Sequence, residues 1–279
     1  MELVTRTVYG SRLQTMQNSK LPFSVEQNTT LNEKFAILAG VNPAAGVYPA
    51  AQYYCIGNGG HALATGTGGI GLVQAQPHLA TDAALYAHLP FVLRATNNDI
   101  TNDVQQKYAL RKQINVGGVN YFAYYLKRIP TDEAVVATVI QTVDGGTTTS
   151  AAFVPSPANL TPTPPVIDPD EVNVLAGQYA NVSATLPVVL TADECTEILN
   201  AAEILFGDQA YGIISEIGLV SAVDYPTTLP NNNTFVEAIC AQVTAFVNTM
   251  HVVEFTPTGI NGSFDLGTNE PLLILSSVQ

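Results

Sequence analysis

A glycine-rich segment is the first place where this sequence could do chemistry. Residues 66–71 read GTGGIG, which formally matches the fingerprint of a dinucleotide-binding loop. The fingerprint needs a hydrophobic strand before it and a helix after it, because the helix N-terminus and the loop amides hold the phosphates together. Here HALAT precedes the motif, and LVQAQ and Pro77 follow it. Both flanks fail this requirement, so we interpret residues 57–71 as a structural loop or a flexible hairpin.

Residue types that bind metals also occur in this region. Cys55, His61, His78 and His88 could be drawn as ligands, but their spacing fits no compact zinc pattern and no second cysteine pair is near. We therefore expect a half-buried cysteine and loop histidines whose hydrogen bonds are satisfied. The sequence predicts no metal and no other cofactor.

Catalytic side chains have no recognisable setting in this sequence. There is no G-x-S-x-G motif that would place a serine on a nucleophile elbow. Paired acids occur at Asp193/Glu194 and Asp170/Glu171, and the first pair lies where a helix is expected to begin, a position that favours acids. We expect no catalytic residues and no enzymatic activity. A hydrolase with dispersed acids is the rival reading.

Basic and aromatic residues alternate between 107 and 128. Three tyrosines, at 121, 124 and 125, stand among five cations there. Such a surface could bind nucleic acid, or it could meet the acidic half of a neighbouring copy. The net charge of −13 favours the second reading. We predict an interface that comprises Lys107, Arg111, Lys112, Tyr124, Lys127 and Arg128.

Charge is distributed unevenly along the chain. All ten basic residues lie between Arg6 and Arg128, and the first 128 residues contain only six acids, a balance of +4. The last 151 residues contain seventeen acids and no lysine or arginine. Charged residues make up 12 % of the chain, against about 25 % in an average soluble domain. This pattern predicts a subunit that contacts copies of itself, or different neighbours at its two ends.

The first half of the chain predicts mainly strands. Residues 1–50 look like a long extended arm, and Thr81–His88 could form a short helix. The alternation in KYALRKQI at 107–114, the Gly117-Gly118 turn and the aromatic run 119–129 indicate a β-hairpin. A helix from Thr101 to Gln113 is the alternative. A second hairpin is expected from 134–143 and 147–154.

The second half begins after a proline-rich segment. Six prolines between 155 and 169 exclude a helix or a central strand and favour extended chain. Thr191–Glu194 reads as a capping box in front of apolar residues at helical spacing. Thr234–Glu237 repeats that pattern before a second apolar stripe ending at Met250. Strands are expected at 182–190 and 213–223, with both helices covering their sheet.

Together these patterns predict an α+β fold with an antiparallel β core, sandwich- or barrel-like, two C-terminal helices and extended arms. We divide the chain into a β-rich part with an arm and the basic hairpin (1–154), a proline-rich crossing segment (155–169) and an acidic α+β part (170–279). The longest apolar runs fall far short of the 18–20 residues of a spanning helix. The N-terminus lacks the apolar region of a secretory signal, and three scattered cysteines suggest reduced thiols and synthesis in a cytoplasm.

Stretches along nearly the whole chain resemble virion structural proteins of tailed bacteriophages. They are VYG at 8, LNEKFAI at 31, GVYPAAQYYCIGNGGH at 46, ATDAALYAHLPFVLR at 80, QKYALRKQI at 106, NYFAYYLKR at 120, FVPSPANLTPTPP at 153 and FDLGTNEPLL at 264. The resemblance implies a non-enzymatic part of the particle, assembled in the host cytoplasm, and it supplies no site residues.

Within that class we favour a homo-oligomeric neck, collar or head–tail connector protein. Its partners would be copies of itself in a ring and adjacent connector, tail or capsid proteins, with DNA nearby and no membrane. The alternatives are a decoration, tail or baseplate component, or a receptor- or glycan-binding module.

Overall fold

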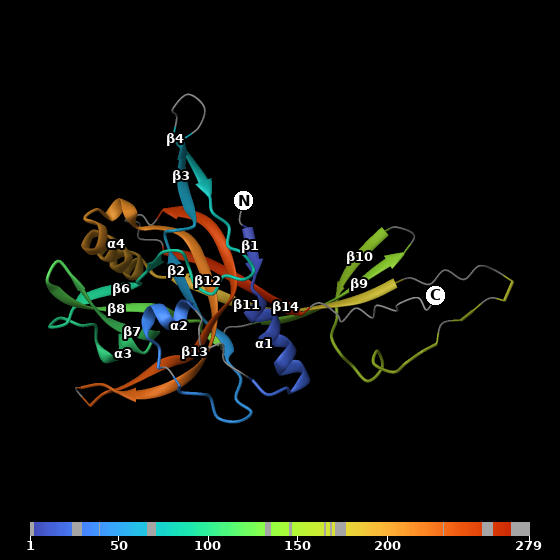
Figure 1. Ribbon diagram of the computed structural model, residues 1–279. Helices are drawn as coiled ribbons and strands as arrows, with labels where there is room; N and C mark the ends of the chain where they lie inside the picture. The colour runs from blue at the N-terminus through green and yellow to red at the C-terminus, as the bar shows by residue number, and fades with distance from the viewer. Residues whose placement is uncertain are drawn as a thin grey trace, which may run out of the picture. The chain divides into compact units, whose positions relative to one another are not determined.

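A computed structural model describes most of the chain. The described residues are 3–23, 30–38, 40–65, 71–131, 135–144, 147–164, 166–167, 169–170, 177–230, 232–252 and 259–268. The fold is β-rich and antiparallel, with few helices, as expected for the α+β class (Figure 1). No helix among the described residues is long and apolar enough to cross a membrane.

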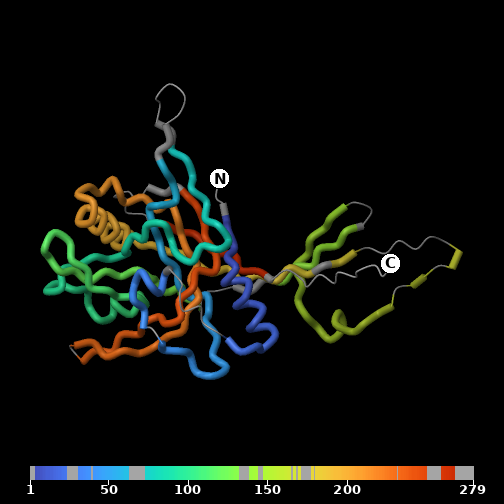
Figure 2. Tube along the Cα trace, viewed as in Figure 1, coloured from blue at the N-terminus to red at the C-terminus, as the bar shows by residue number. Residues whose placement is uncertain are grey.

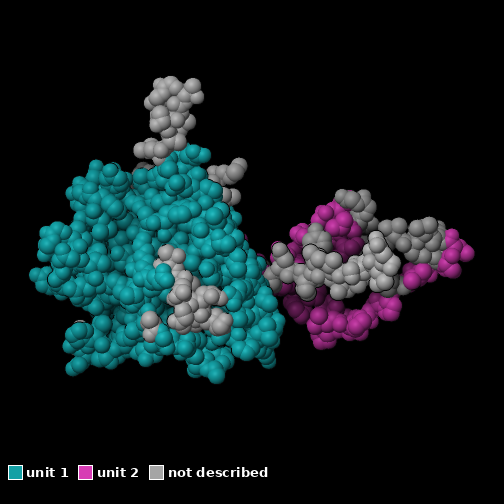
Figure 3. Space-filling model, in the orientation of Figure 1, with its two compact units in different colours: residues 1–129, 188–262 teal, residues 130–187, 263–279 magenta. Residues whose placement is uncertain are grey.

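The chain forms two compact units (Figure 3). Unit 1 comprises residues 1–129 and 188–262, and unit 2 comprises residues 130–187 and 263–279. These bounds differ from the three segments predicted from composition, because unit 1 takes strands from both ends of the sequence. Composition can divide a chain only into consecutive segments, whereas the units form where strands pair between segments that are distant in the sequence.

Unit 1 contains an eight-stranded sheet. Its main path runs β1-β13-β12-β2-β8-β6, with β5 paired to β2 and β7 paired to β8. The tube in Figure 2 shows the late strands β12 and β13 running among the early strands. The antiparallel β core is as predicted, but the described strands form no closed barrel. The members are β1 (Leu3–Arg6), β2 (Ala50–Gly57), β5 (His88–Leu89), β6 (Val92–Ala95), β7 (Tyr108–Val116), β8 (Val119–Arg128), β12 (Ile213–Thr228) and β13 (Thr234–Val252).

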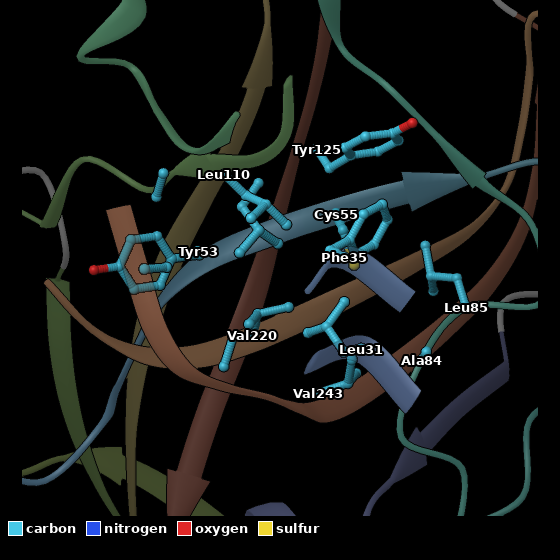
Figure 4. Packing of buried hydrophobic residues seen from close by; sticks show 14 of the residues in the cluster. Leu31, Phe35, Tyr53, Cys55, Ala84, Leu85, Leu110, Tyr125, Val220 and Val243 are labelled. Atoms are coloured by element: carbon cyan, nitrogen blue, oxygen red, sulfur yellow. The ribbon is translucent and has the colours of Figure 1, made fainter. Parts of the chain in front are cut away.

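A hydrophobic core packs against this sheet. The short helix α2 (Thr30–Phe35) contributes Leu31 and Phe35, which lie four residues apart and therefore share one face of the helix. Figure 4 shows them beside Cys55, Val243 and other buried side chains of the strands. The rings of Phe35 and Tyr125 lie 4.3 Å apart. Each fully buried side chain of this size contributes about 1.5–3 kcal/mol, so α2 is held by packing rather than by its own propensity.

Two predictions for the N-terminal half, an extended arm over residues 1–50 and a helix from Thr81 to His88, were wrong. Residues 8–19 form α1 (Val8–Ser19) instead of an extended arm, with the Thr7 side chain accepting from the Gly10 amide as a cap. Residues 81–88 form turns that lead into β5, and no helix is found there. The alternative helix from Thr101 shrinks to α3 (Asn102–Gln105).

The larger correction concerns residues 234–252. The second predicted capping box and its apolar stripe are not a helix but β13, the longest strand of the sheet. Most residues between Phe235 and Phe246 are buried, because α1, α2 and β7 pack against β13 in addition to its strand neighbours β1 and β12. A strand buried on both faces shows a continuous apolar run without alternation, and such a run resembles a helical stripe.

Other predictions are confirmed. The Thr191 capping box begins α4 (Ala192–Phe206), and Gly207 ends it in the left-handed region. β7 and β8 form the expected hairpin, with φ of 58° and 87° at Gly117 and Gly118. Such values favour glycine. A one-turn helix, η2 (Gln209–Tyr211), follows α4.

Unit 2 contains most of a separate four-stranded sheet in the order β10-β9-β11-β14. The second predicted hairpin appears as β9 (Val135–Asp144) and β10 (Thr147–Ala152), joined by β11 (Gly177–Leu190) and β14 (Ile260–Thr268). The described residues of the proline-rich segment form turns, bends and extended chain, without helix or strand. A third sheet pairs only β3 (His61–Thr65) with β4 (Gly71–Ala75).

Candidate functional site

The six predicted interface residues lie together in the structure. Arg111 and Lys112 belong to β7, Tyr124, Lys127 and Arg128 belong to β8, and Lys107 directly precedes β7. Their surroundings differ from the expectation, however, since four of the five cations contact acids of the same chain.

Lys127 is the most enclosed of these cations. Its Nζ lies 2.6 Å from Glu194 Oε2 and 2.6 Å from the Val189 carbonyl oxygen. Burial lowers the pKa of Lys127, and the carboxylate of Glu194 opposes that effect. The same oxygen accepts from the Thr191 amide at 2.8 Å, completing the capping box of α4. Glu194 therefore joins α4 to β8 and is a structural residue.

Arg111 and Tyr124 both donate hydrogen bonds to Asp99. The guanidinium of Arg111 donates to Asp99 Oδ2 at 2.8 Å, and the Tyr124 hydroxyl donates to Oδ1 at 2.9 Å. The guanidinium carbon also lies 3.4 Å from the ring centroid of Phe122, a cation–π contact. Tyr124 is fully buried, and this burial raises the pKa of its hydroxyl, with Asp99 adding to the rise. Tyr124 is thus a core residue and offers no surface to a partner.

The remaining ion pairs connect the hairpin to the acidic half of the chain. Lys112 lies 2.9 Å from Glu237 on β13, and Arg128 lies 2.7 Å from Asp224 on β12. The opposite charges of the two halves therefore meet inside one chain. Lys107 is exposed and forms no ion pair among the described residues. The interface hypothesis stays a prediction, and Lys107 is its most accessible cation.

A second polar cluster, which the sequence analysis missed, is centred on Glu216 of β12. Its carboxylate is fully buried. Oε1 accepts from the amides of Gly59 and Ala87 at 3.1 and 2.9 Å, and Oε2 accepts from the Tyr86 amide at 3.0 Å and contacts His78 Nε2 at 2.7 Å. An acid inside the apolar strand ISEIGLV was the only signal in the sequence.

The His78 ring completes this Glu216 cluster. Its Nδ1 lies 3.0 Å from Asp82 Oδ2, so both ring nitrogens face carboxylate oxygens. Tyr86 stacks on one side at 4.1 Å between ring centroids, and Phe246 stacks at 3.9 Å. A buried ring with every polar atom engaged positions the surrounding loop rather than reacting with a substrate.

Neighbouring bonds fix the base of the β3–β4 hairpin. Ser215 Oγ accepts from the Gly60 amide at 2.9 Å, and Asn248 Nδ2 donates to the Gln76 carbonyl at 2.7 Å. A Cβ at Gly60 would lie 2.2 Å from the Ser215 carbonyl oxygen, so only glycine fits there. Residues 66–70 of the glycine motif lie outside the described residues. Their flanks, β3 and β4, pair antiparallel, which is unlike a nucleotide-binding strand and helix.

The other candidate residues do not converge on a reactive centre. Burial raises the pKa of the Cys55 thiol and lowers that of His88 to about 3. No group of three or more metal-binding side chains is found among the described residues. Asp193 and Glu194 stand in the first turn of α4 as predicted, while Asp170 lies in a turn and Glu171 is outside the described part.

Unit 2 differs from unit 1 in how little apolar surface it buries. Among its described residues only Leu186 and Phe264 are buried hydrophobic side chains, and all six residues of β10 are exposed. The proline-rich segment and its approach expose large apolar side chains, namely Val154 (78 %), Leu160 (61 %), Val166 (95 %) and Ile167 (64 %). A small sheet needs a hydrophobic face covered by a second layer for independent stability, so this surface is suited to contact with another chain.

Comparison with known proteins places the chain in a family. One family model matches residues 1–279. The protein belongs to the DUF7208 family, a family of unknown function. No curated protein and no solved structure matches it. The match covers the residues of both units.

Proposed function

We propose that this protein is a non-enzymatic structural subunit of a tailed-bacteriophage virion, which forms a ring of identical copies at the neck as a collar or head–tail connector protein. The resemblance of its sequence stretches to phage virion proteins supports this assignment. The ion pairs of unit 1 support a structural role as well, because they join distant strands of one sheet.

The observation that carries the proposal is the exposed apolar surface of unit 2. Val154 and Val166 expose apolar surface to water, which is unfavourable. Burying one such side chain against another chain would contribute roughly 1.5–3 kcal/mol to the free energy of association. Repeated in every copy, such contacts would stabilise an assembly without a site of high affinity for a small ligand. A virion component is held in place by contacts with adjacent subunits, and burial of these apolar side chains would supply such contacts.

The excess of acids fits a position near packaged DNA. Four acids of the second half, Glu194, Glu197, Asp224 and Glu237, pair with basic residues of the first half, and Glu216 is buried beside His78. The second half contains seventeen acids and no lysine or arginine, so its own charge remains strongly negative. An acidic lumen would repel the phosphate backbone and let DNA pass without adhesion. We expect side chains from Asp168 onward to line that lumen.

The test is the mass of the purified full-length chain, measured by native mass spectrometry and light scattering. We expect a discrete closed oligomer of the 29.5 kDa chain, visible as rings in electron micrographs. A stable monomer that binds on a glycan array would replace the proposal with a receptor- or glycan-binding module. Antibody labelling of purified virions then tests the position, since label on the capsid surface or the tail tip would contradict a neck protein.

A further inference from the structure

The four-stranded sheet ends in two open edges. In the order β10-β9-β11-β14, the strands β10 and β14 each have a single neighbour among the described residues (Figure 1). An unpaired edge presents a row of free amides and carbonyls, and isolated proteins usually protect it with charged residues, prolines or a covering segment. The sequence of β10, TTTSAA, contains neither a charge nor a proline.

The hydrogen-bond pattern shows which groups of β10 point outward. The Phe153 amide donates to the Thr138 carbonyl at 2.8 Å, and this pair continues the β10–β9 register. Residues facing each other in an antiparallel pair alternate between bonded and non-bonded positions. Thr149 and Ala151 are therefore bonded to β9, whereas the backbone groups of Thr148, Ser150 and Ala152 face the open edge.

The other edge strand, β14, runs in the direction that antiparallel pairing with β10 of another copy requires. A Cβ at Gly262 would lie nearest the Val188 carbonyl oxygen, and one at Gly267 would lie nearest that of Val182, so β14 and β11 run antiparallel. β9 is antiparallel to both β10 and β11. The two edge strands consequently run in opposite directions, and β10 of one copy can pair antiparallel with β14 of another in the same sense as every other pair of the sheet.

The two faces of the sheet also continue across such a contact. Following the registers, Ala151, Ile140 and Ala180 share one face, and alternation along β11 adds Val182 to it. Phe264 and Leu266 of β14 lie on this face, because Thr185 pairs through its side chain with Asp265 on the other. Ser150 lies on that other face with Asp265 and Ser263. Both faces are mixed, since Thr142 shares the face of Ile140 and Val139 shares the face of Ser150. Joining the edges would place each face of one sheet beside the same face of the next.

We propose that β10 of each copy adds to β14 of the next copy, so that the unit 2 sheets form one continuous antiparallel sheet around the ring. This inference rests on the proposed function, which supplies identical copies in a ring. The contact is heterologous, since two different surfaces meet, and contacts of this type generate rings when the rotation between copies closes. The occupant of the β10 edge is thus a second copy of this chain.

The first test uses Ser150→Pro, with Ser150→Val as its matched control. Proline at 150 removes an outward amide and adds a ring at the open edge, while the bonds to β9 remain. Valine keeps the amide and favours a strand. We expect the proline variant to lose the oligomer while its circular dichroism and melting temperature match those of the valine variant, which should still assemble. A proline variant that assembles normally would overturn the inference.

The second test is disulfide trapping with Ser150→Cys/Ser263→Cys. Within one chain the two edges are separated by three strand spacings, about 14 Å, and a disulfide requires Cα atoms within about 7 Å. Cys55, Cys195 and Cys240 are buried, so the introduced thiols react preferentially. We expect a ladder of cross-linked chains on a non-reducing gel, and only monomers for each single variant. Dimers from Ser150→Cys alone would show that β10 meets β10, which contradicts the proposal.

These outcomes separate the two proposals. A wild-type chain that is monomeric in the mass measurement contradicts the ring itself. A wild-type ring that persists in Ser150→Pro, or that gives no ladder with the double cysteine variant, contradicts only the pairing of β10 with β14.

Discussion

Replacing Glu216 with glutamine should destabilise unit 1 strongly while leaving its shape unchanged. Each carboxylate oxygen of Glu216 faces two groups, the Gly59 and Ala87 amides on Oε1 and the Tyr86 amide and His78 on Oε2. A glutamine must point its NH₂ group toward one of these pairs, whichever way the amide turns. At least one backbone amide then loses its acceptor in a site that water does not reach, and two lose it when the NH₂ group faces Gly59 and Ala87.

The size of the effect follows from that count. A hydrogen bond to a charged group contributes about 1.5–3 kcal/mol, so losing one or two should cost about 1.5–6 kcal/mol in the free energy of unfolding. Chemical denaturation measures this loss, and hydrogen exchange should show the Gly59, Tyr86 and Ala87 amides opening before the rest of the sheet. Glu203→Gln on the exposed side of α4 is the control, expected within about 0.5 kcal/mol of wild type. If both variants unfold alike, the Glu216 cluster does not fix the loop as we infer.

Three further results are expected. Thr191→Ala removes the cap of α4 and should cost about 0.5–2 kcal/mol in denaturant unfolding, whereas Thr234→Ala, at the start of a strand, should cost less than about 0.5 kcal/mol; equal losses would contradict the reassignment of β13. Burial lowers the pKa of His88 from 6.5 to about 3, so the unfolded chain alone gains a proton below pH 6.5 and stability should fall with acidification by up to about 1.4 kcal/mol per pH unit. His88→Gln should reduce that slope in denaturation curves at several pH values. Burial raises the pKa of Tyr54 and Tyr108 above the ordinary value of 10, so stability should be lost as pH rises past 10, with tyrosinate absorbance appearing together with unfolding rather than before it.

The sequence predicts local structure where one short signal determines it. The glycine pair at 117–118 and the alternation beside it specify the β7–β8 hairpin, and Thr191 with Glu194 specifies the start of α4. The same Thr-x-x-Glu pattern at 234 misleads, because a capping box and a strand can share residues. The register between β12 and β13 also shifts near Val223 of β12, and Cys240 of β13 has a φ of 55°, which disrupts the alternation expected of a strand.

The polar clusters depend on contacts between distant segments, and no local pattern encodes them. His78 and Glu216 are 138 positions apart, and Lys112 and Glu237 are 125 positions apart. The charge imbalance between the halves was visible, yet charge alone does not say whether opposite signs meet within a chain or between chains. Strand order decides this, since β7 and β8 lie in the same sheet as β12 and β13.

The discontinuity of unit 1 has a consequence for synthesis. β2 pairs with β12 at the centre of the sheet, and β1 pairs with β13, yet residues 58–212 are translated between β2 and β12. At about 5–20 residues per second the ribosome needs roughly 8–30 s to cover that interval. During this time β2 lacks its partner β12, and the edge of β2 that will pair with β12 is exposed to other chains. The sheet of unit 1 therefore cannot be completed before β12 and β13 have been translated, which favours chaperone binding early.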